Sequence, residues 1–148
     1  AGWAFMQQAL RDGGRFFDGE PWVMGDVATI SPVERDRILT ELRARYRSDY
    51  ATRWRGWVRG LQVVRPSNVK DASAKLGVLG GPQSPLLAAL SLAARNTMVD
   101  SSMLAAFQPV QAVTPGEVTD KFVSPANEPY VKAVIGAKVA LEQAANLP

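Results

Sequence analysis

The chain has 148 residues and a formal net charge of +3, and its 47% hydrophobic and 21% charged residues are typical of one globular domain. It contains no cysteine and no histidine. Disulfides, thiolate or imidazole metal sites, and Ser-His or Cys-His catalytic pairs are therefore excluded.

The positive charge and the aromatic residues are concentrated in the first part of the chain. Residues 1–65 hold eleven arginines against eight acidic residues, and nine of the twelve aromatic residues precede residue 58. The most apolar run, 86–94, is far shorter than the roughly 18 residues that a membrane span needs. The chain starts without methionine and within a helical pattern, which predicts a fragment of a longer protein.

A first helix is predicted over 3–17, where Trp3, Met6 and Leu10 recur at helical spacing. The loop that follows contains three acidic residues, which are candidates for paired carboxylates or a cation site. Nothing in the sequence fixes their geometry, so a solvated loop around one tryptophan is favoured. The three acidic residues are Asp18, Glu20 and Asp26.

A long helix is predicted from Pro32 to about residue 64. Ser31 is the expected N-cap, Pro32 stands at the first helical position, and Glu34 completes a capping box. The helix is expected to end at Arg65, because the residue before a proline is pushed out of the helical region. The residues of its predicted apolar face are Ile38, Leu42, Tyr46, Tyr50, Trp54, Trp57, Leu61 and Val64.

Shorter helices are predicted after the long one. Asn68, followed by Asp71, begins one that ends in the stretch 77–82, and Ser84 with Pro85 begins the next, which runs to about Thr97. Two prolines interrupt the following residues, so 98–127 is predicted to be an irregular connection, and 128–146 a final helix. The fold class is therefore all-α: a helical bundle built on the long amphipathic helix, forming a single domain over residues 1–148.

The stretch 46–57 combines four aromatic residues with arginines and has two interpretations. It is either the buried face of a helix or part of a basic nucleic-acid-binding helix over 35–59. The arginines are spread around the helix rather than aligned along one side, which favours a core helix. Pairing of Asp49 with Arg53 and a cation–π contact of Arg53 with Trp57 are expected.

No motif indicates catalysis. Ser67 and Lys70 match the S-x-x-K pattern of penicillin-recognising serine enzymes, but the partner motifs are missing, and a helix start explains them better. The glycines at 77, 80 and 81 lack the lysine of a phosphate-binding loop, so a helix end and turn is favoured. We expect no enzyme activity, no cofactor, no bound metal and no small-molecule substrate.

Several short motifs, taken in order, resemble the IcmF-related region of the IcmF/TssM proteins of bacterial type VI secretion. They lie within residues 1–107, and a looser similarity extends to residue 147. The motifs are AGW at 1–3, WVMG at 22–25, the pattern formed by Tyr46, Asp49, Tyr50 and Trp54, GGPQSPL at 80–86 and AARNT at 93–97.

The resemblance implies a structural scaffold module of the trans-envelope membrane complex, in the periplasmic part of a larger inner-membrane-anchored protein. The partners it implies, through the parent protein, are an outer-membrane lipoprotein and a small inner-membrane subunit. Self-association is also expected, and nucleic acid is not an expected partner.

Eight family-motif positions carry over as structural rather than catalytic residues. At one of them, Trp54→Ala is expected to cost about 3–5 kcal/mol, as truncations of buried aromatic residues do. The eight positions are Trp22, Gly25, Tyr46, Asp49, Tyr50, Trp54, Ser84 and Pro85.

Overall fold

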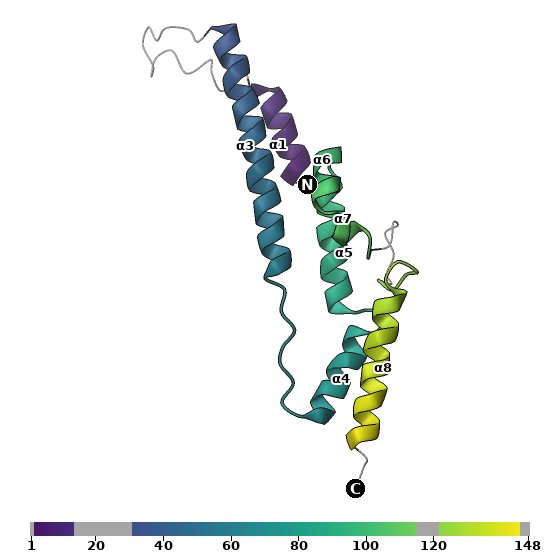
Figure 1. Cartoon of the computed structure of the whole chain (residues 1–148). Helices are drawn as coiled ribbons and strands as arrows, with labels where there is room; N and C mark the ends of the chain where they lie inside the picture. The colour runs from purple at the N-terminus through teal and green to yellow at the C-terminus, as the bar shows by residue number, and fades with distance from the viewer. Residues whose placement is uncertain (1, 14–30, 115–121, 146–148) are drawn as a thin grey trace. The chain divides into compact units, whose positions relative to one another are not determined.

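The computed structural model describes residues 2–13, 31–114 and 122–145. Regular structure in these ranges consists of seven α-helices and no strands, which confirms the all-α prediction (Figure 1). The helices are α1 (Gly2–Arg11), α3 (Pro32–Arg59), α4 (Val69–Leu79), α5 (Pro85–Thr97), α6 (Ser101–Ala106), α7 (Gln108–Gln111) and α8 (Glu128–Ala145).

The chain folds as two compact units, Ala1–Arg53 and Trp54–Pro148. Helix α3 continues from the first unit into the second, while α1 belongs to the first and α4 to α8 belong to the second. That residues 1–148 form a single domain stays a prediction, because it concerns how the two units associate.

In the first unit, α1 packs along α3 through aromatic side chains. The ring centroid of Trp3 lies 5.5 Å from that of Tyr46 and 4.9 Å from that of Tyr50. At the other end of α1, the Arg43 guanidinium donates a hydrogen bond of 3.0 Å to the Leu10 carbonyl. The tilted rings have the geometry that aromatic pairs prefer, so the aromatic residues of α3 do contribute to packing.

The start of α3 follows the sequence prediction in part. The Glu34 N–H donates to Ser31 Oγ at 3.2 Å, as expected of an N-cap. The Glu34 carboxylate, however, accepts a hydrogen bond of 3.0 Å from Arg37 Nε. That bond lowers the pKa of Glu34, and the carboxylate serves the ion pair with Arg37 in the first turns of the helix.

The prediction that the long helix continues to about residue 64 is wrong, because α3 ends at Arg59. The N–H of Gly60 donates to the carbonyls of Gly56 at 2.9 Å and Trp57 at 3.2 Å, which tightens the last turn. Gly56 in the final turn, and Gly60 directly after it, each reduce helix propensity by about 1 kcal/mol relative to alanine. The apolar spacing that continues beyond Gly60 therefore belongs to a non-helical segment.

Helix α1 also differs from its predicted span of 3–17. It ends at Arg11, and two further described residues, Asp12 and Gly13, are not α-helical. The rest of the predicted span, and the acidic loop after it, lie outside the described residues. The Arg11 guanidinium donates a hydrogen bond to the Gln7 carbonyl in the preceding turn. The helix dipole favours a cation at this carboxyl end of the helix.

In the second unit, α4 and α8 lie side by side (Figure 1). Two glycines of the α4 end permit this approach. A Cβ atom at Gly80 would lie 2.9 Å from Ile135 Cδ1, and one at Gly77 would lie 3.3 Å from Lys138 Cε. The glycines at these two positions therefore make room for the side chains of α8, which the sequence alone explained only as a helix end and turn.

A polar connection also joins α4 to α8. The buried Ser73 hydroxyl donates to Glu142 Oε1 at 2.8 Å, and Lys138 Nζ donates to the same oxygen at 2.7 Å. These bonds, that of Lys138 being the stronger influence, lower the pKa of Glu142. The ionised carboxylate is therefore the form that the contact between the two helices favours.

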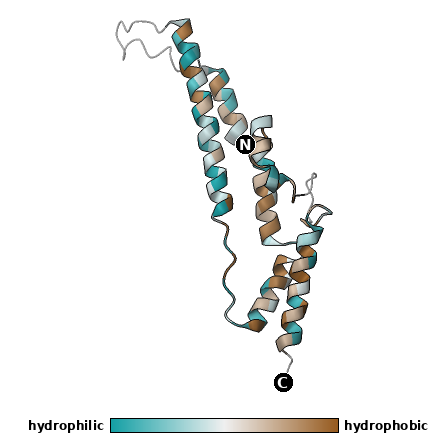
Figure 2. Ribbon diagram, in the orientation of Figure 1, coloured by the Kyte–Doolittle hydropathy of each residue, from teal (hydrophilic) through white to brown (hydrophobic). Residues whose placement is uncertain are grey.

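Helices α5, α6 and α7 supply most of the core. Figure 2 shows hydrophobic residues along α5 and mainly hydrophilic residues along α3. The Thr97 hydroxyl, at the end of α5, donates to the Ala93 carbonyl at 2.9 Å and accepts from Gln111 Nε2 of α7 at 3.1 Å. The buried hydrophobic residues of these helices and of the turn between α6 and α7 are Leu87, Ala93, Ala94, Met103 and Phe107.

The structure differs from the irregular connection predicted over 98–127, because α6 and α7 form within it. Asp100 caps α6 by accepting a hydrogen bond of 2.9 Å from the Met103 N–H. Pro109 falls in the first turn of α7, where its missing N–H has no helical partner to lose. The predicted final helix 128–146 is present as α8, Glu128–Ala145.

Asn127, immediately before α8, is almost completely buried. Its amide nitrogen donates to the carbonyls of Val113 at 3.0 Å and Phe122 at 2.8 Å, and its amide oxygen accepts from the Ser124 N–H at 3.0 Å. One side chain thus joins the segment after α7 to the turn before α8. Such a fully bonded amide is the form in which a buried polar group is stable.

Candidate interaction surface

Among the family-motif positions of α3, Asp49 does not make the contact that the sequence predicted. Tyr46, Tyr50 and Trp54 are half-buried, and burial raises the pKa of Tyr46, with a smaller contribution from Tyr50. Asp49 is instead exposed, and within the described part of the chain no ion pair joins it to Arg53. The expectation that Asp49 pairs with Arg53 is therefore wrong, and both side chains are exposed.

The cation–π contact also involves other residues than expected. Trp54 and Trp57 pack edge to face with centroids 5.4 Å apart, and the guanidinium of Arg55, not Arg53, lies 5.6 Å from the ring centroid of Phe107. Because Trp54 is only half-buried, the loss expected for Trp54→Ala falls below the 3–5 kcal/mol that full burial would imply.

Ser84 and Pro85 occupy the expected places at the start of α5. The Ser84 side chain is completely buried and its Oγ accepts a hydrogen bond of 3.4 Å from the Leu87 N–H, while Pro85 is the first residue of the helix. Trp22 and Gly25 lie outside the described residues. The structural role of all eight motif positions stays a prediction.

The S-x-x-K residues Ser67 and Lys70 do not meet. Ser67 donates both its N–H, at 2.8 Å, and its hydroxyl, at 3.1 Å, to the Asp71 carboxylate, and Lys70 is exposed. Asn68 Oδ1 accepts from the Asp71 N–H at 2.9 Å as the N-cap of α4. The motif therefore acts as a helix start here, as the sequence favoured.

No cluster of acidic residues suited to a metal ion occurs among the described residues. The arginines of α3 also divide into several roles. Arg37 pairs with both Glu34 and Glu41, which raises its pKa, while Arg43 binds the Leu10 carbonyl. Arg45 and others of the 35–59 stretch remain exposed. The exposed arginines are thus interspersed with arginines that stabilise the fold.

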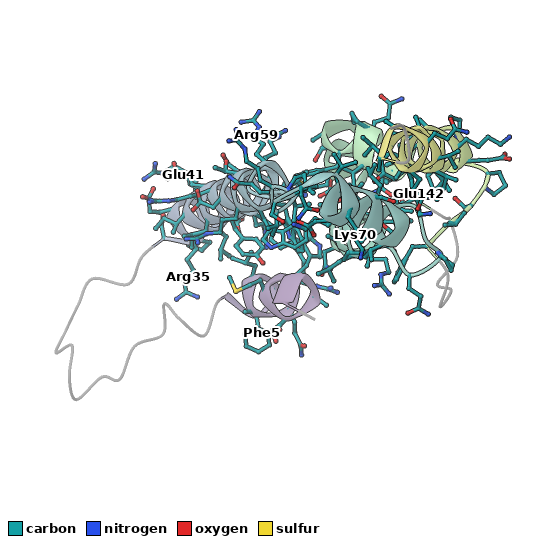
Figure 3. The ribbon with its side chains drawn as sticks, turned by 90° about the horizontal axis from the view of Figure 1, so that it is seen from below. Phe5, Arg35, Glu41, Arg59, Lys70 and Glu142 are labelled. Atoms are coloured by element: carbon teal, nitrogen blue, oxygen red, sulfur yellow. The ribbon has the colours of Figure 1, made fainter. Side chains whose placement is uncertain are left out.

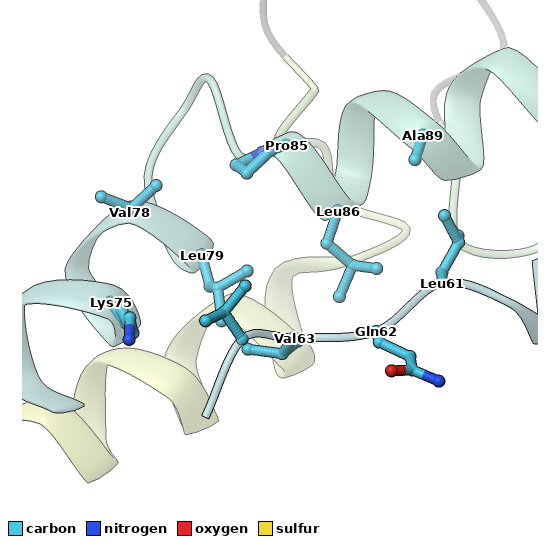
Figure 4. A pocket seen from close by; sticks show the side chains of 10 residues that line it. Leu61, Gln62, Val63, Lys75, Val78, Leu79, Pro85, Leu86 and Ala89 are labelled. Atoms are coloured by element: carbon cyan, nitrogen blue, oxygen red, sulfur yellow. The ribbon is translucent and has the colours of Figure 1, made fainter. Parts of the chain in front are cut away.

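An apolar hollow of the second unit lies where the chain leaves α3. It is an apolar groove of about 370 Å³ between the non-helical segment 61–64 and helices α4 and α5 (Figure 4). We call it the 61–64 groove. The residues lining it are Leu61, Gln62, Val63, Val64, Lys75, Val78, Leu79, Pro85, Leu86 and Ala89.

Lys75 holds the segment beside α4. Its ammonium donates to the Arg65 carbonyl at 3.0 Å and to the Asp71 carboxylate at 2.8 Å. The hydrogen bond from Lys75, followed by that from the Ser67 N–H, lowers the pKa of Asp71. One lysine thus connects the residue after segment 61–64 to the first turn of α4.

The 61–64 groove and the two buried polar connections at Thr97 and Asn127 were not predicted from the sequence. The groove was hidden because the apolar spacing at 61 and 64 continues that of the long helix. Gly60 was the available signal for a helix end. The polar connections had no sequence signal, since the contacts that join separate segments, Gln111 to Thr97 and Asn127 to Val113, are each 14 positions apart.

No helix in the described ranges combines the length and hydropathy needed to cross a lipid bilayer. These observations define an all-α region whose buried polar side chains cap helices or connect them, and which carries an exposed apolar groove. Comparison with known proteins gives its family. The chain belongs to the IcmF-related family, whose model, described as "Intracellular multiplication and human macrophage-killing", matches residues 1–98.

The matched residues include α1, α3, α4 and α5, and they confirm the resemblance drawn from the sequence motifs. The 61–64 groove lies entirely within them. No curated protein and no solved structure matches the chain.

Proposed function

We propose that this chain is a structural scaffold module of the type VI secretion trans-envelope membrane complex, located in the periplasmic part of an inner-membrane IcmF/TssM-like protein. The family match over residues 1–98 carries the proposal. The use of Ser73, Thr97 and Asn127 as connections between helices supports a structural rather than a catalytic role. The proposed partners, through the parent protein, are the outer-membrane lipoprotein, the small inner-membrane subunit and further copies of the same protein.

The cellular location can be tested by cysteine labelling, because the chain has no native cysteine. Val33 is 80% exposed and Ala93 is completely buried. In the full parent protein, we expect a membrane-impermeant maleimide to label Val33→Cys in spheroplasts. Ala93→Cys is the matched control and should react only after denaturation. Labelling of Val33→Cys only after lysis would place the segment inside the cell and refute the proposal.

The scaffold role is tested separately by crosslinking in cells. A photo-crosslinking residue at Leu42, which is 46% exposed on α3, should form adducts with identified subunits of the secretion complex or with a second copy of the parent protein. The same residue at the buried Ala94 is the control and should give no intermolecular adduct. Correct location without any adduct from several exposed positions of α3 would argue against a scaffold.

The alternative to the scaffold function is a basic nucleic-acid-binding helix over 35–59. The exposed arginines of α3 are the observation that supports it. That function requires an affinity for duplex DNA that falls steeply with salt, because phosphate contacts release counterions. Arg45→Glu, at an exposed position, should then weaken binding, while Arg37→Glu would mainly disturb the ion pairs of Arg37. Absence of salt-dependent DNA binding at low ionic strength would exclude the alternative.

A further inference from the structure

We propose that the 61–64 groove binds an extended, acidic segment of a partner protein by strand addition. Strand addition means that the incoming segment forms main-chain hydrogen bonds with an exposed backbone and places alternate side chains in neighbouring pockets. The proposal goes beyond the scaffold role and stands without it, because it depends only on the contacts of residues 54–89.

The first observation concerns backbone hydrogen bonds. The Leu61 N–H donates to the Val58 carbonyl, and the Arg65 carbonyl accepts from Lys75. Between these two bonds, the N–H and carbonyl groups of Gln62, Val63 and Val64 have no hydrogen-bond partner within the described part of the chain. A non-helical backbone of this kind can pair with another chain in the same way as the edge strand of a sheet.

The second observation is the apolar surface beside that backbone. Val63 is 54% exposed, Val64 is 74% exposed, and Val78 of α4 is 59% exposed. The segment passes Leu79 of α4 and Leu86 of α5, which form the floor of the groove (Figure 4). Covering such side chains contributes roughly 25 cal/mol per Å² of apolar area, so alternate apolar residues of a partner would add to the main-chain bonds.

The third observation is charge. Residues 54–70 contain four basic residues and no acidic residue. Arg55 lies over Phe107, whereas Arg59, Arg65 and Lys70, which flank segment 61–64 along the chain, have exposed side chains. In Figure 3 the Arg59 side chain extends outward from α3, and Lys70 lies on α4. This unbalanced charge is complementary to a segment whose outward-facing residues are acidic.

Two other partners fit these observations less well. A lipid surface would attract the basic and apolar side chains, but hydrocarbon offers nothing to the backbone groups of 62–64, and each unpaired group there costs several kcal/mol. A nucleic acid would satisfy the cations and leave the exposed valines without an apolar partner. An extended acidic polypeptide satisfies the backbone, the valines and the cations together.

The test uses the intact 148-residue chain and a fluorescein-labelled peptide of alternating glutamate and valine. We expect saturable binding by fluorescence anisotropy, and at least about tenfold weaker binding of a peptide that is N-methylated at alternate backbone positions. Replacement of glutamate by lysine in the peptide should weaken binding to a similar extent. Equal binding of the N-methylated peptide, or no saturable binding, would overturn strand addition.

The site is tested by a pair of variants. Val64 is 74% exposed, and Val64→Asp should weaken peptide binding at least about tenfold. Val33, near the start of α3, is 80% exposed, and Val33→Asp should leave peptide binding unchanged. Both variants should keep the helical circular dichroism spectrum. Equal effects of the two variants would overturn the assignment. Phosphatidylglycerol vesicles that bind the chain and displace the peptide through the same Val64 would replace it with a membrane contact.

Discussion

Helices α3 and α5 both follow an apolar spacing typical of buried helices, yet only one of them is buried. Helix α3 has 28 residues and only Ala51 of them is buried, whereas α5 has 13 residues and buries five. The buried residues of α5 are mostly small, so its neighbours approach closely, while α3 carries long arginines and bulky rings. Apolar spacing therefore indicates which face can pack, but it does not show how completely neighbouring elements cover that face.

The largest expected effect is a loss of stability in the buried core of the second unit. Phe107 is 3% exposed, so Phe107→Ala should lower the free energy of unfolding by about 3–5 kcal/mol. Urea denaturation of the intact chain, followed by circular dichroism, measures the loss. A decrease below about 1 kcal/mol would show that the second unit has no tightly packed core around Phe107.

Asn127→Ala should cost about 3 kcal/mol, because it removes an almost completely buried amide and leaves the part-buried carbonyls of Val113 and Phe122 without their donor. Asn68→Ala is the matched control, since Asn68 is exposed and only caps α4, and should cost about 1 kcal/mol. Equal losses in urea denaturation would mean that Asn127 contributes no more than a helix cap does.

Gly80→Val should cost about 1–3 kcal/mol, because its Cβ would lie 2.9 Å from Ile135 Cδ1 and would push α8 away from α4. Gly56→Ala is the contrasting variant on α3, where a Cβ would meet nothing within 4 Å. It should stabilise the chain by up to about 1 kcal/mol through helix propensity. We expect the melting temperature to fall in Gly80→Val and to rise in Gly56→Ala. Shifts of the same sign would contradict the different packing of the two glycines.

The pH dependence of stability follows from the lowered pKa of Glu142. Because the pKa of Glu142 is lowered in the folded chain, its ionised carboxylate stabilises the fold at neutral pH. This stabilisation is lost as the pH falls through that pKa. Glu142→Gln should therefore reduce the loss of melting temperature on acidification below about pH 5. Glu128→Gln, which removes an exposed pair with Lys132 within α8, is the control. A steeper acid dependence in Glu142→Gln would contradict the sign.

The smallest effect is expected on the exposed face of α3. Leu42 is 46% exposed, so Leu42→Ala should change the free energy of unfolding by less than about 0.5 kcal/mol. Alanine has slightly better helix propensity, which offsets the small loss of packing. A loss above about 2 kcal/mol would show that Leu42 is covered in solution, for example by a second copy of the chain.

Helix starts could be predicted from the sequence because their signals are local. Ser31, Asn68 and Ser84 each accept a hydrogen bond from the backbone three residues on, as the cap patterns predicted. The end of α3 was predicted too late, because the apolar spacing outweighed the signal of Gly60. Helix α6 was missed because six residues are too few for a periodic pattern to emerge.

The candidate site could not be predicted in the same way. The 61–64 groove depends on the ammonium of Lys75 reaching the carbonyl of Arg65, a contact between residues ten positions apart. Likewise, the glycines at 77 and 80 have a packing role that is visible only once α8 lies beside α4. Sequence patterns report neighbours within a few residues, whereas these features depend on partners brought together by the tertiary fold.

The pairing of α4 with α8 has a consequence for the order of events during synthesis. Ser73 and Glu142 are 69 positions apart, so α4 leaves the ribosome long before the helix that covers it. The capped helix α5 can form from local contacts in the meantime. The part of α4 around Gly77 and Gly80, which packs against α8, stays uncovered until α8 has been synthesised. Closing so long a loop is slow compared with forming a helix. The second unit therefore completes its fold late, and a ribosome stalled before residue 128 would present α4 to chaperones.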